Sequence, residues 1–122
     1  SLANPKTAPY GKAAMQAIKK AGLYKKLESK FVYAESISQT LSYALTAVEI
    51  GIVAKSSLYS SKMQAYKEDV NWKEVDSSLY KAIEQGIVLL KYGSEAKGYK
   101  DFYDFILSKQ AQNIFKKYGY TL

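Results

Sequence analysis

The chain has no cysteine and no histidine. Without cysteine it can form no disulfide bridge, thiolate metal site or cysteine nucleophile. Without histidine it has neither the commonest side chain for proton transfer nor the commonest metal ligand, which argues against an enzyme. Long apolar runs are also missing, since the longest, such as residues 86–90, fall far short of the roughly 20 residues of a membrane span. We therefore expect no enzyme activity, no cofactor, no metal and no membrane-spanning segment.

Several sequence motifs of known sites are absent as well. The chain has no Gly-x-x-x-x-Gly-Lys phosphate loop, no Gly-x-Gly-x-x-Gly fingerprint and no Gly-x-Ser-x-Gly elbow. The acidic residues of 68–76 lie in a polar stretch, where a solvated surface is the expected role. Residues 1–5 have neither a charged nor an apolar region of a secretory signal, so we expect that no signal peptide is part of this sequence.

The net charge is +7, because 18 Lys and Arg residues stand against 11 Asp and Glu residues. Such a charge could serve nucleic acid, an anionic lipid or the long-range attraction of an anion. The lysines are spread along the chain, with short doublets at 19–20, 25–26 and 116–117. A nucleic-acid site usually concentrates its charge. We therefore expect a solvated basic surface and no nucleic-acid partner.

A length of 122 residues suits one domain or one lobe of a larger protein. Apolar spacing predicts a helix over 8–21, with Pro9 in its first turn and Gly22 as its stop. Residues 31–34 have the composition of a buried strand. Ser36 and Gln39 form a capping-box pattern, which predicts the start of a second helix.

Further along the chain, residues 50–54 and 83–91 are predicted strands, and 72–75 is a shorter one. Helices are predicted over 95–107 and from a cap at Ser108 to a stop at Gly119. Their aromatic stripe is typical of a buried core. Alternating strands and helices predict an α/β fold: a small mixed sheet flanked by helices, with a C-terminal helical hairpin.

Two predicted helices begin after short loops of small or neutral residues, at 7–11 and at 35–38. The first backbone N–H groups of a helix lack internal partners and lie at the positive end of its dipole, so a helix start can hold an anion. If both starts lie at the carboxyl edge of one sheet, they converge on one crevice. Every α/β protein has such starts, however, and two capped helices without a ligand explain this pattern equally well.

Six segments, in the same order, resemble the periplasmic molybdate-binding proteins, which are the soluble receptors of ABC-type oxyanion importers. The family patterns and their positions here are N-P-x-x-A-P-x-G-x-A-A at 4–14, A-G-L-W…K-L at 21–27, E-N-[IV]-x-Q-A-L at 35–41, G-F-V-A-x-S at 51–56, L-Y-x-x-I-x-Q…V-L-L-K at 79–91, and F-L-x-S-x-x-A…I…Y-G-Y at 105–120. One such match is weak evidence, whereas six in register cover most of the chain.

The resemblance implies one lobe of a type II periplasmic binding protein, whose two lobes close on the ligand. Residues 1–82 would form the second, ligand-binding lobe, and residues 83–122 the hinge strand and C-terminal helices that return to a missing first lobe. The implied function is periplasmic capture of molybdate, or tungstate, for delivery to a membrane ABC permease. A lobe without its partner exposes apolar surface, so we also expect a homodimer or a segment-swapped dimer.

The family holds its tetrahedral oxyanion mainly by backbone amides and hydroxyls, half from each lobe. Position by position, the contacts fall on the backbone amides of Tyr10 and Ile37, and on Ala54, where some members have a tyrosine hydroxyl. Alanine lacks that hydroxyl, which leaves the identity of the anion open. The turn between Tyr43 and Gly51 is also shorter than the family pattern.

Three alternatives remain at this point. The chain could be the ligand-sensing effector lobe of a transcription regulator with the same fold. It could instead bind a related, sulfate-like oxyanion. A basic nucleic-acid-binding module is the third, and the scattered lysines argue against it.

Overall fold

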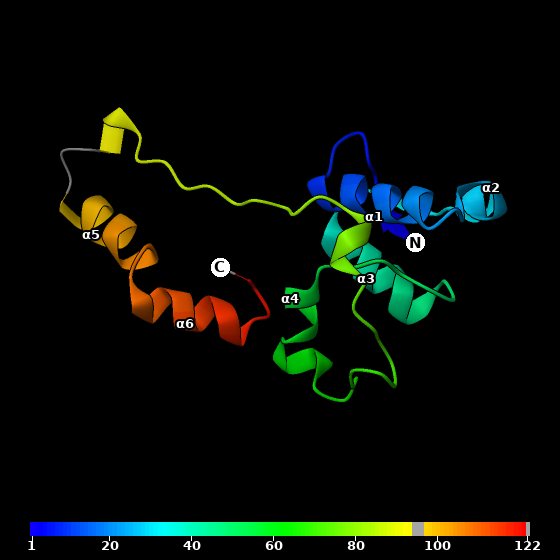
Figure 1. Ribbon diagram of the computed structural model, residues 1–122. Helices are drawn as coiled ribbons and strands as arrows, with labels where there is room; N and C mark the ends of the chain where they lie inside the picture. The colour runs from blue at the N-terminus through cyan, green and yellow to red at the C-terminus, as the bar shows by residue number, and fades with distance from the viewer. Residues whose placement is uncertain (94–96, 122) are drawn as a thin grey trace. The chain divides into compact units, whose positions relative to one another are not determined.

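A computed structural model describes residues 1–93 and 97–121 of the chain (Figure 1). The chain divides into two compact units, Ser1–Ile83 and Glu84–Leu122, and each is described by itself. The predicted start of the helix over 95–107 lies outside the described residues.

The first unit is built on a short parallel sheet. Strand β1 (Leu2–Ala3) pairs in parallel with β2 (Tyr33–Ala34), with Leu2 opposite Tyr33. Leu2 also forms a parallel bridge with Ile52, whose backbone N–H donates to the carbonyl oxygen of Ser1. The Leu2 N–H donates to the Val32 carbonyl, on the β2 side. The carbonyls of successive strand residues point to opposite sides, so the Ser1 carbonyl points away from β2, and Ile52 lies on that side of β1. β1 is therefore the central strand.

Two long helices pack on this central strand, α1 (Pro9–Lys20) after β1 and α3 (Ile37–Thr46) after β2. In Figure 1 both helices begin toward the left-hand end of the unit and run to the right. The chain passes from β1 outward to β2 and then back across β1 to Ile52. Since such crossovers are right-handed, the two helices cover opposite faces of the sheet.

Helix α1 forms because its small apolar residues recur on one face. Ala14 and Ile18 are almost fully buried and pack with Leu2 of β1. The helix ends before Gly22, whose φ of 73° suits glycine far better than other residues. The helix predicted over 8–21 is confirmed. The chain continues through α2 (Tyr24–Leu27) and the 3-10 turn η1 (Glu28–Lys30).

The start of α3 has the predicted capping box. The Ser36 hydroxyl oxygen accepts a hydrogen bond from the Gln39 backbone N–H at 3.1 Å. In return, the Gln39 side-chain oxygen accepts from the backbone N–H of Glu35 at 2.8 Å. Thr40 is fully buried, and its hydroxyl donates to the carbonyl of Ser36. These bonds fix the point at which the chain leaves β2 and enters the helix.

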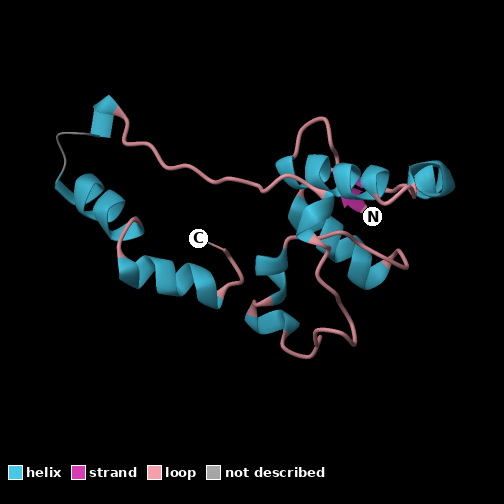
Figure 2. Cartoon of the chain, in the orientation of Figure 1, coloured by secondary structure: helices cyan, strands magenta, loops and turns pink. Residues whose placement is uncertain are grey.

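The remaining elements are short in the first unit and helical in the second, as Figure 2 shows. Ser108 caps the last helix by accepting from the Ala111 N–H at 3.3 Å, and Gly119 ends it with a φ of 80°. The predicted C-terminal helices are thus confirmed over the residues described. The bounds are α4 (Lys55–Leu58), η2 (Ser61–Met63), η3 (Ser77–Leu79), η4 (Lys91–Gly93), α5 (Lys97–Ile106) and α6 (Lys109–Lys117).

The predicted strands differ most from the structure. Residues 83–90 form no regular secondary structure, so the strand predicted over 83–91 is wrong for this chain. A strand is stable only beside a hydrogen-bonded neighbour, and no strand among the described residues pairs with this segment. Its side chains are correspondingly open to solvent, with Val88 77% and Leu90 68% exposed.

The other strand predictions are too long. Residues 50–54 contribute only the bridge at Ile52, and residues 31–34 only β2. The stretch 72–75 forms no strand beyond a bridge between Glu68 and Trp72. The aromatic stripe predicted to be core is also exposed, with Phe102 59% accessible on α5. Side-chain composition predicted these segments, but composition does not reveal whether a neighbour is present to bury them.

Candidate functional site

The three residues singled out by the resemblance follow the carboxyl ends of three parallel segments. Tyr10 follows β1, Ile37 follows β2, and Ala54 follows the bridge residue Ile52. Parallel segments have their carboxyl ends at the same edge of a sheet, which is where open α/β proteins bind ligands. The connections that leave β1 and β2 enter helices on opposite faces of the sheet.

The loop from β1 to α1 is organised by Asn4. Its backbone N–H extends the ladder by donating to the Ala34 carbonyl at 2.9 Å, and its own carbonyl accepts from the Ala8 N–H at 2.9 Å. Its side-chain oxygen accepts from the Lys6 N–H at 3.0 Å. These bonds fold the loop into a tight turn, so that α1 begins close to the end of the strand.

Gly11 lies in the first turn of α1, directly against the end of β1. A Cβ atom at this position would stand 2.2 Å from the Ala3 carbonyl oxygen and 2.8 Å from the Asn4 carbonyl carbon. Both are backbone atoms, which cannot move aside without shifting the strand. Only glycine therefore allows the helix start this close to the sheet. The sequence interpretation quoted this glycine in a motif but gave it no role.

The amides at the two helix starts lie ahead of the helical hydrogen-bond ladders. In α1 the N–H of Lys12 donates to Ala8, so Tyr10 comes before that first bond. In α3 the Ser36 hydroxyl oxygen accepts a hydrogen bond from the Gln39 N–H. Among the described residues, the backbone N–H of Ile37 donates no hydrogen bond.

Neither first turn contains an acidic side chain. Acidic residues are favoured at this position because they neutralise the positive end of the helix dipole. Glu35 lies just before the cap of α3, and it is exposed. Both helices are at least ten residues long, so each has a full dipole. The two starts retain positive potential that an external anion can use.

Ala54 is buried, at 4% exposure, and forms the N-cap position of α4. Its methyl group donates no hydrogen bond, and a four-residue helix adds little dipole. The next residue, Lys55, binds Glu74 at 2.6 Å. That hydrogen bond raises the pKa of Lys55 and neutralises its charge locally. The lysine that follows Ala54 in the sequence is therefore already paired within the protein.

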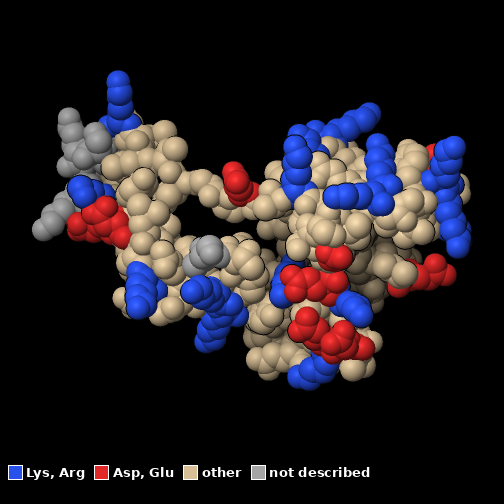
Figure 3. All heavy atoms as spheres, viewed as in Figure 1, with Lys and Arg blue, Asp and Glu red and all other residues tan. Residues whose placement is uncertain are grey.

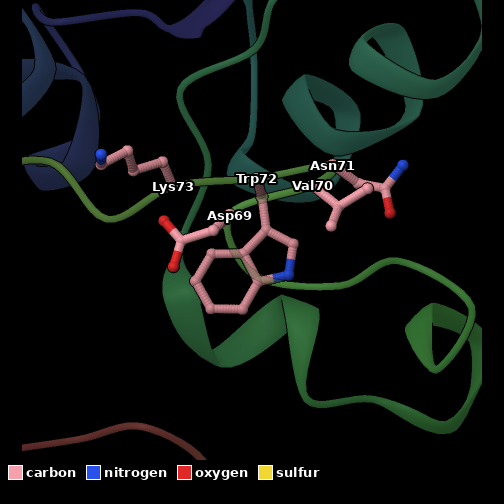
Figure 4. A pocket seen from close by; sticks show the side chains of 5 residues that line it. All are labelled: Asp69, Val70, Asn71, Trp72 and Lys73. Carbon is pink, nitrogen blue, oxygen red and sulfur yellow. The ribbon is translucent and has the colours of Figure 1, made fainter.

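A separate hollow lies in the turn after η2. It is lined by Asp69, Val70, Asn71, Trp72 and Lys73, and Figure 4 shows the Asn71 and Lys73 side chains pointing in opposite directions. A binding pocket needs polar groups that converge on one point. The hollow contains none of the three residues above, and we assign it no ligand.

Two classes of site can be checked over the described residues. Within 1–93 and 97–121, no group of three or more acidic side chains is placed to hold a metal ion. Over the same residues, no helix is long and apolar enough to cross a membrane.

Comparison with known proteins defines the class of this chain. The model of the bacterial extracellular solute-binding proteins matches residues 1–121. The molybdate-binding protein ModA of Rhodobacter capsulatus is 40% identical over 122 residues, which is 99% of this chain and 46% of that protein. ModA of Azotobacter vinelandii is 37% identical over 123 residues, covering 100% of this chain and 48% of that protein. ModA of Escherichia coli is 30% identical, covering 100% and 46%.

The chain belongs to the bacterial extracellular solute-binding protein family. The resemblance to molybdate-binding proteins is confirmed, since the similarity extends over the whole chain. The α/β lobe expected from it agrees with the parallel sheet and flanking helices. The chain spans about half the length of the curated relatives it matches.

Proposed function

We propose that this chain supplies one half of a binding site for molybdate, with tungstate as a close substitute. The observation that supports this most strongly is the pair of helix starts at one sheet edge, α1 after β1 and α3 after β2. They occur in a chain that aligns throughout with molybdate-binding proteins. In the proposed site the Tyr10 and Ile37 backbone amides donate to the anion.

In the proposed site, backbone N–H groups and helix dipoles bind the anion, and no positively charged side chain neutralises it. Backbone N–H groups at a helix start have fixed directions and add the favourable potential of the helix dipole. Fixed donors suit a rigid tetrahedral anion and select it by size. A smaller anion such as sulfate leaves buried donors unpaired, at a cost of about 1–3 kcal/mol each. No bond is made or broken, so the proposed activity is transport binding.

Ala54 bears on which anion is preferred. In the family pattern a tyrosine hydroxyl occupies this position in some members, and here a buried methyl replaces it. This lobe therefore offers one hydrogen-bond donor fewer. An anion that needs only the remaining backbone amides is favoured. A related, sulfate-like oxyanion is therefore the second candidate, and it rests on this one substitution.

The rest of the proposed site lies in a second lobe. In this proposal residues 1–82 are the ligand-binding lobe, and residues 83–122 are a hinge segment, which would pair as a strand only beside the other lobe, and helices that pack against that lobe. The exposed side chains of 87–90 and of α5 support this, because a covering surface would bury them. Without that surface, a homodimer or a segment-swapped dimer could cover them. The complete protein would work in the periplasm and deliver its anion to a membrane ABC permease.

Substitution of Ile37 by proline tests the grip directly. Proline removes the backbone N–H and is well tolerated at the first position of a helix. Ser36 before it has φ −142° and ψ 161°, the extended conformation that a following proline requires. In a protein with both lobes, Ile37→Pro should weaken molybdate binding roughly 10- to 150-fold in a calorimetric titration, since a hydrogen bond to a charged group contributes about 1.5–3 kcal/mol.

Ile37→Ala is the matched control, because it shortens the side chain and keeps the amide. Its affinity should remain within about threefold of the parent, since the amide and not the side chain binds the anion. Circular dichroism would check that both variants stay folded. Equal affinities for the parent and Ile37→Pro, with the helix intact, would refute the role of this amide.

A further inference from the structure

The positive charge of the chain is concentrated at its amino-terminal end. Residues 1–30 contain seven lysines and a single acidic residue, Glu28, so this stretch carries +6 of the net +7. The remaining 92 residues contain 11 lysines and 10 acidic residues and are almost neutral. All 18 basic residues of the chain are lysines. The imbalance arises because lysines are denser in residues 1–30 and acidic residues are almost absent there.

Most of this charge gathers where α1 ends and α2 begins. We define the lysine patch as Lys19, Lys25, Lys26 and Lys30, all of which are exposed. Among the residues that the structure describes, none of the four forms a salt bridge. Lys20 is left out because its amino group donates to the Ser78 carbonyl at 2.6 Å. Figure 3 shows basic side chains along the upper side of the first unit, over α1 and α2.

An exposed apolar residue, Leu23, lies in the sequence between the lysines of the patch. Gly22, with φ 73°, turns the chain sharply between the two helices and leaves Leu23 44% exposed. Beside it, the Lys19 amino group lies 5.2 Å from the centre of the Tyr24 ring. The surface therefore combines cations, an exposed leucine and a half-buried tyrosine.

This surface is too far from the helix starts to act on the proposed anion site. Lys19 follows Tyr10 by nine residues, about 14 Å along α1 at the rise of a regular helix. Charges are screened over about 8 Å at physiological ionic strength. Lysines that attract the anion to its site would have to lie at the N-terminal end of α1, whereas the lysine patch lies at its C-terminal end.

We propose that the lysine patch docks the protein on an anionic phospholipid surface, with Leu23 entering the headgroup layer. The four lysines of the patch match the negative charge of such a surface. An apolar side chain among cations is the composition of interfacial membrane contacts. A protein partner fits less well, because protein interfaces are enriched in arginine and depleted in lysine. The basic residues of 1–30 are all lysines, with no arginine among them.

Sedimentation with lipid vesicles tests this docking surface, with the 122-residue chain as the sample. The chain should bind vesicles of phosphatidylcholine and phosphatidylglycerol, should not bind phosphatidylcholine alone, and should dissociate at high salt. Replacing Lys19, Lys25, Lys26 and Lys30 by glutamine should weaken binding by at least about tenfold, given the contribution of each lysine near an anionic surface. Leu23→Ser should weaken it less.

The matched control replaces four exposed lysines elsewhere, Lys62, Lys67, Lys109 and Lys116, by glutamine. It has the same net charge as the patch variant and should keep the parent's affinity within about threefold, because the patch charges are retained. Equal losses in the two variants would show attraction by net charge alone and would overturn the proposal. So would an absence of binding to anionic vesicles, which would favour an acidic protein surface as the partner. Neither readout depends on molybdate.

Discussion

Titrated with molybdate, the 122-residue chain should bind at least about a hundredfold more weakly than a protein that carries both lobes, because two lost donors to a charged ligand at about 1.5 kcal/mol each already account for this factor. The chain matches only about half of each relative's length. In the proposed clamp, the donors of the other lobe and the exclusion of water are both missing. Calorimetry on the two proteins under the same conditions measures the difference.

The control for this comparison is folding of the isolated chain. Its circular dichroism should show the helices α1, α3, α5 and α6, so that weak binding reflects a missing half and not an unfolded one. Equal affinities of the short and the long protein would contradict the half-site proposal. They would place all of the binding energy within these 122 residues.

Gly11→Ala should destabilise the first unit, because Gly11 lies directly against the backbone of β1. The added Cβ would stand 2.2 Å from the Ala3 carbonyl oxygen and 2.7 Å from its carbonyl carbon, so α1 must move off the strand. Forcing an atom into such a contact costs about 1–3 kcal/mol or more. Thermal unfolding should show a midpoint lowered by roughly 4–8 °C for each kcal/mol. A displaced α1 would also move Tyr10, so anion binding in the complete protein should weaken too.

Gly98→Ala is the matched control for this substitution. Gly98 also lies near the start of a helix, α5, but a Cβ there meets no atom within 4 Å. Alanine is the better helix former, so this variant should be as stable as the parent or more stable by up to about 1 kcal/mol. If both variants unfolded at the parent's temperature, the close approach of α1 to β1 would be refuted.

The helices were predictable because their signals are local. Ser36 and Ser108 cap helices as predicted, and Gly22 and Gly119 end them in left-handed conformations. Each of these residues acts on backbone groups within four positions of itself. The sequence alone therefore contains the required information.

The strands were poorly predicted because their partners are distant in the sequence. β1 was missed, since two residues show no periodicity, yet Leu2 and Ala3 are the central strand. Residues 83–91 have strand composition but no neighbour among the described residues to pair with. The same limit applied to Gly11, whose role depends on a backbone oxygen across the sheet edge.

The candidate site was identified from both local and remote information. Helix starts at Tyr10 and Ile37 follow from local patterns, whereas their place at one sheet edge depends on parallel pairing of β1 and β2. The small, neutral residues before these two helices singled out their starts, and the resemblance added a ligand to them. The lysine patch was overlooked because the lysines were considered by their spacing and not by their balance with acidic residues.

The most direct test of the anion grip is the amide NMR spectrum of a ¹⁵N-labelled protein with both lobes, recorded with and without molybdate. A hydrogen bond to a dianion deshields the donor proton, so the Tyr10 and Ile37 amide protons should show the largest downfield shifts within residues 1–82. If these two signals stay in place while others move, the anion binds elsewhere and the proposed site is wrong.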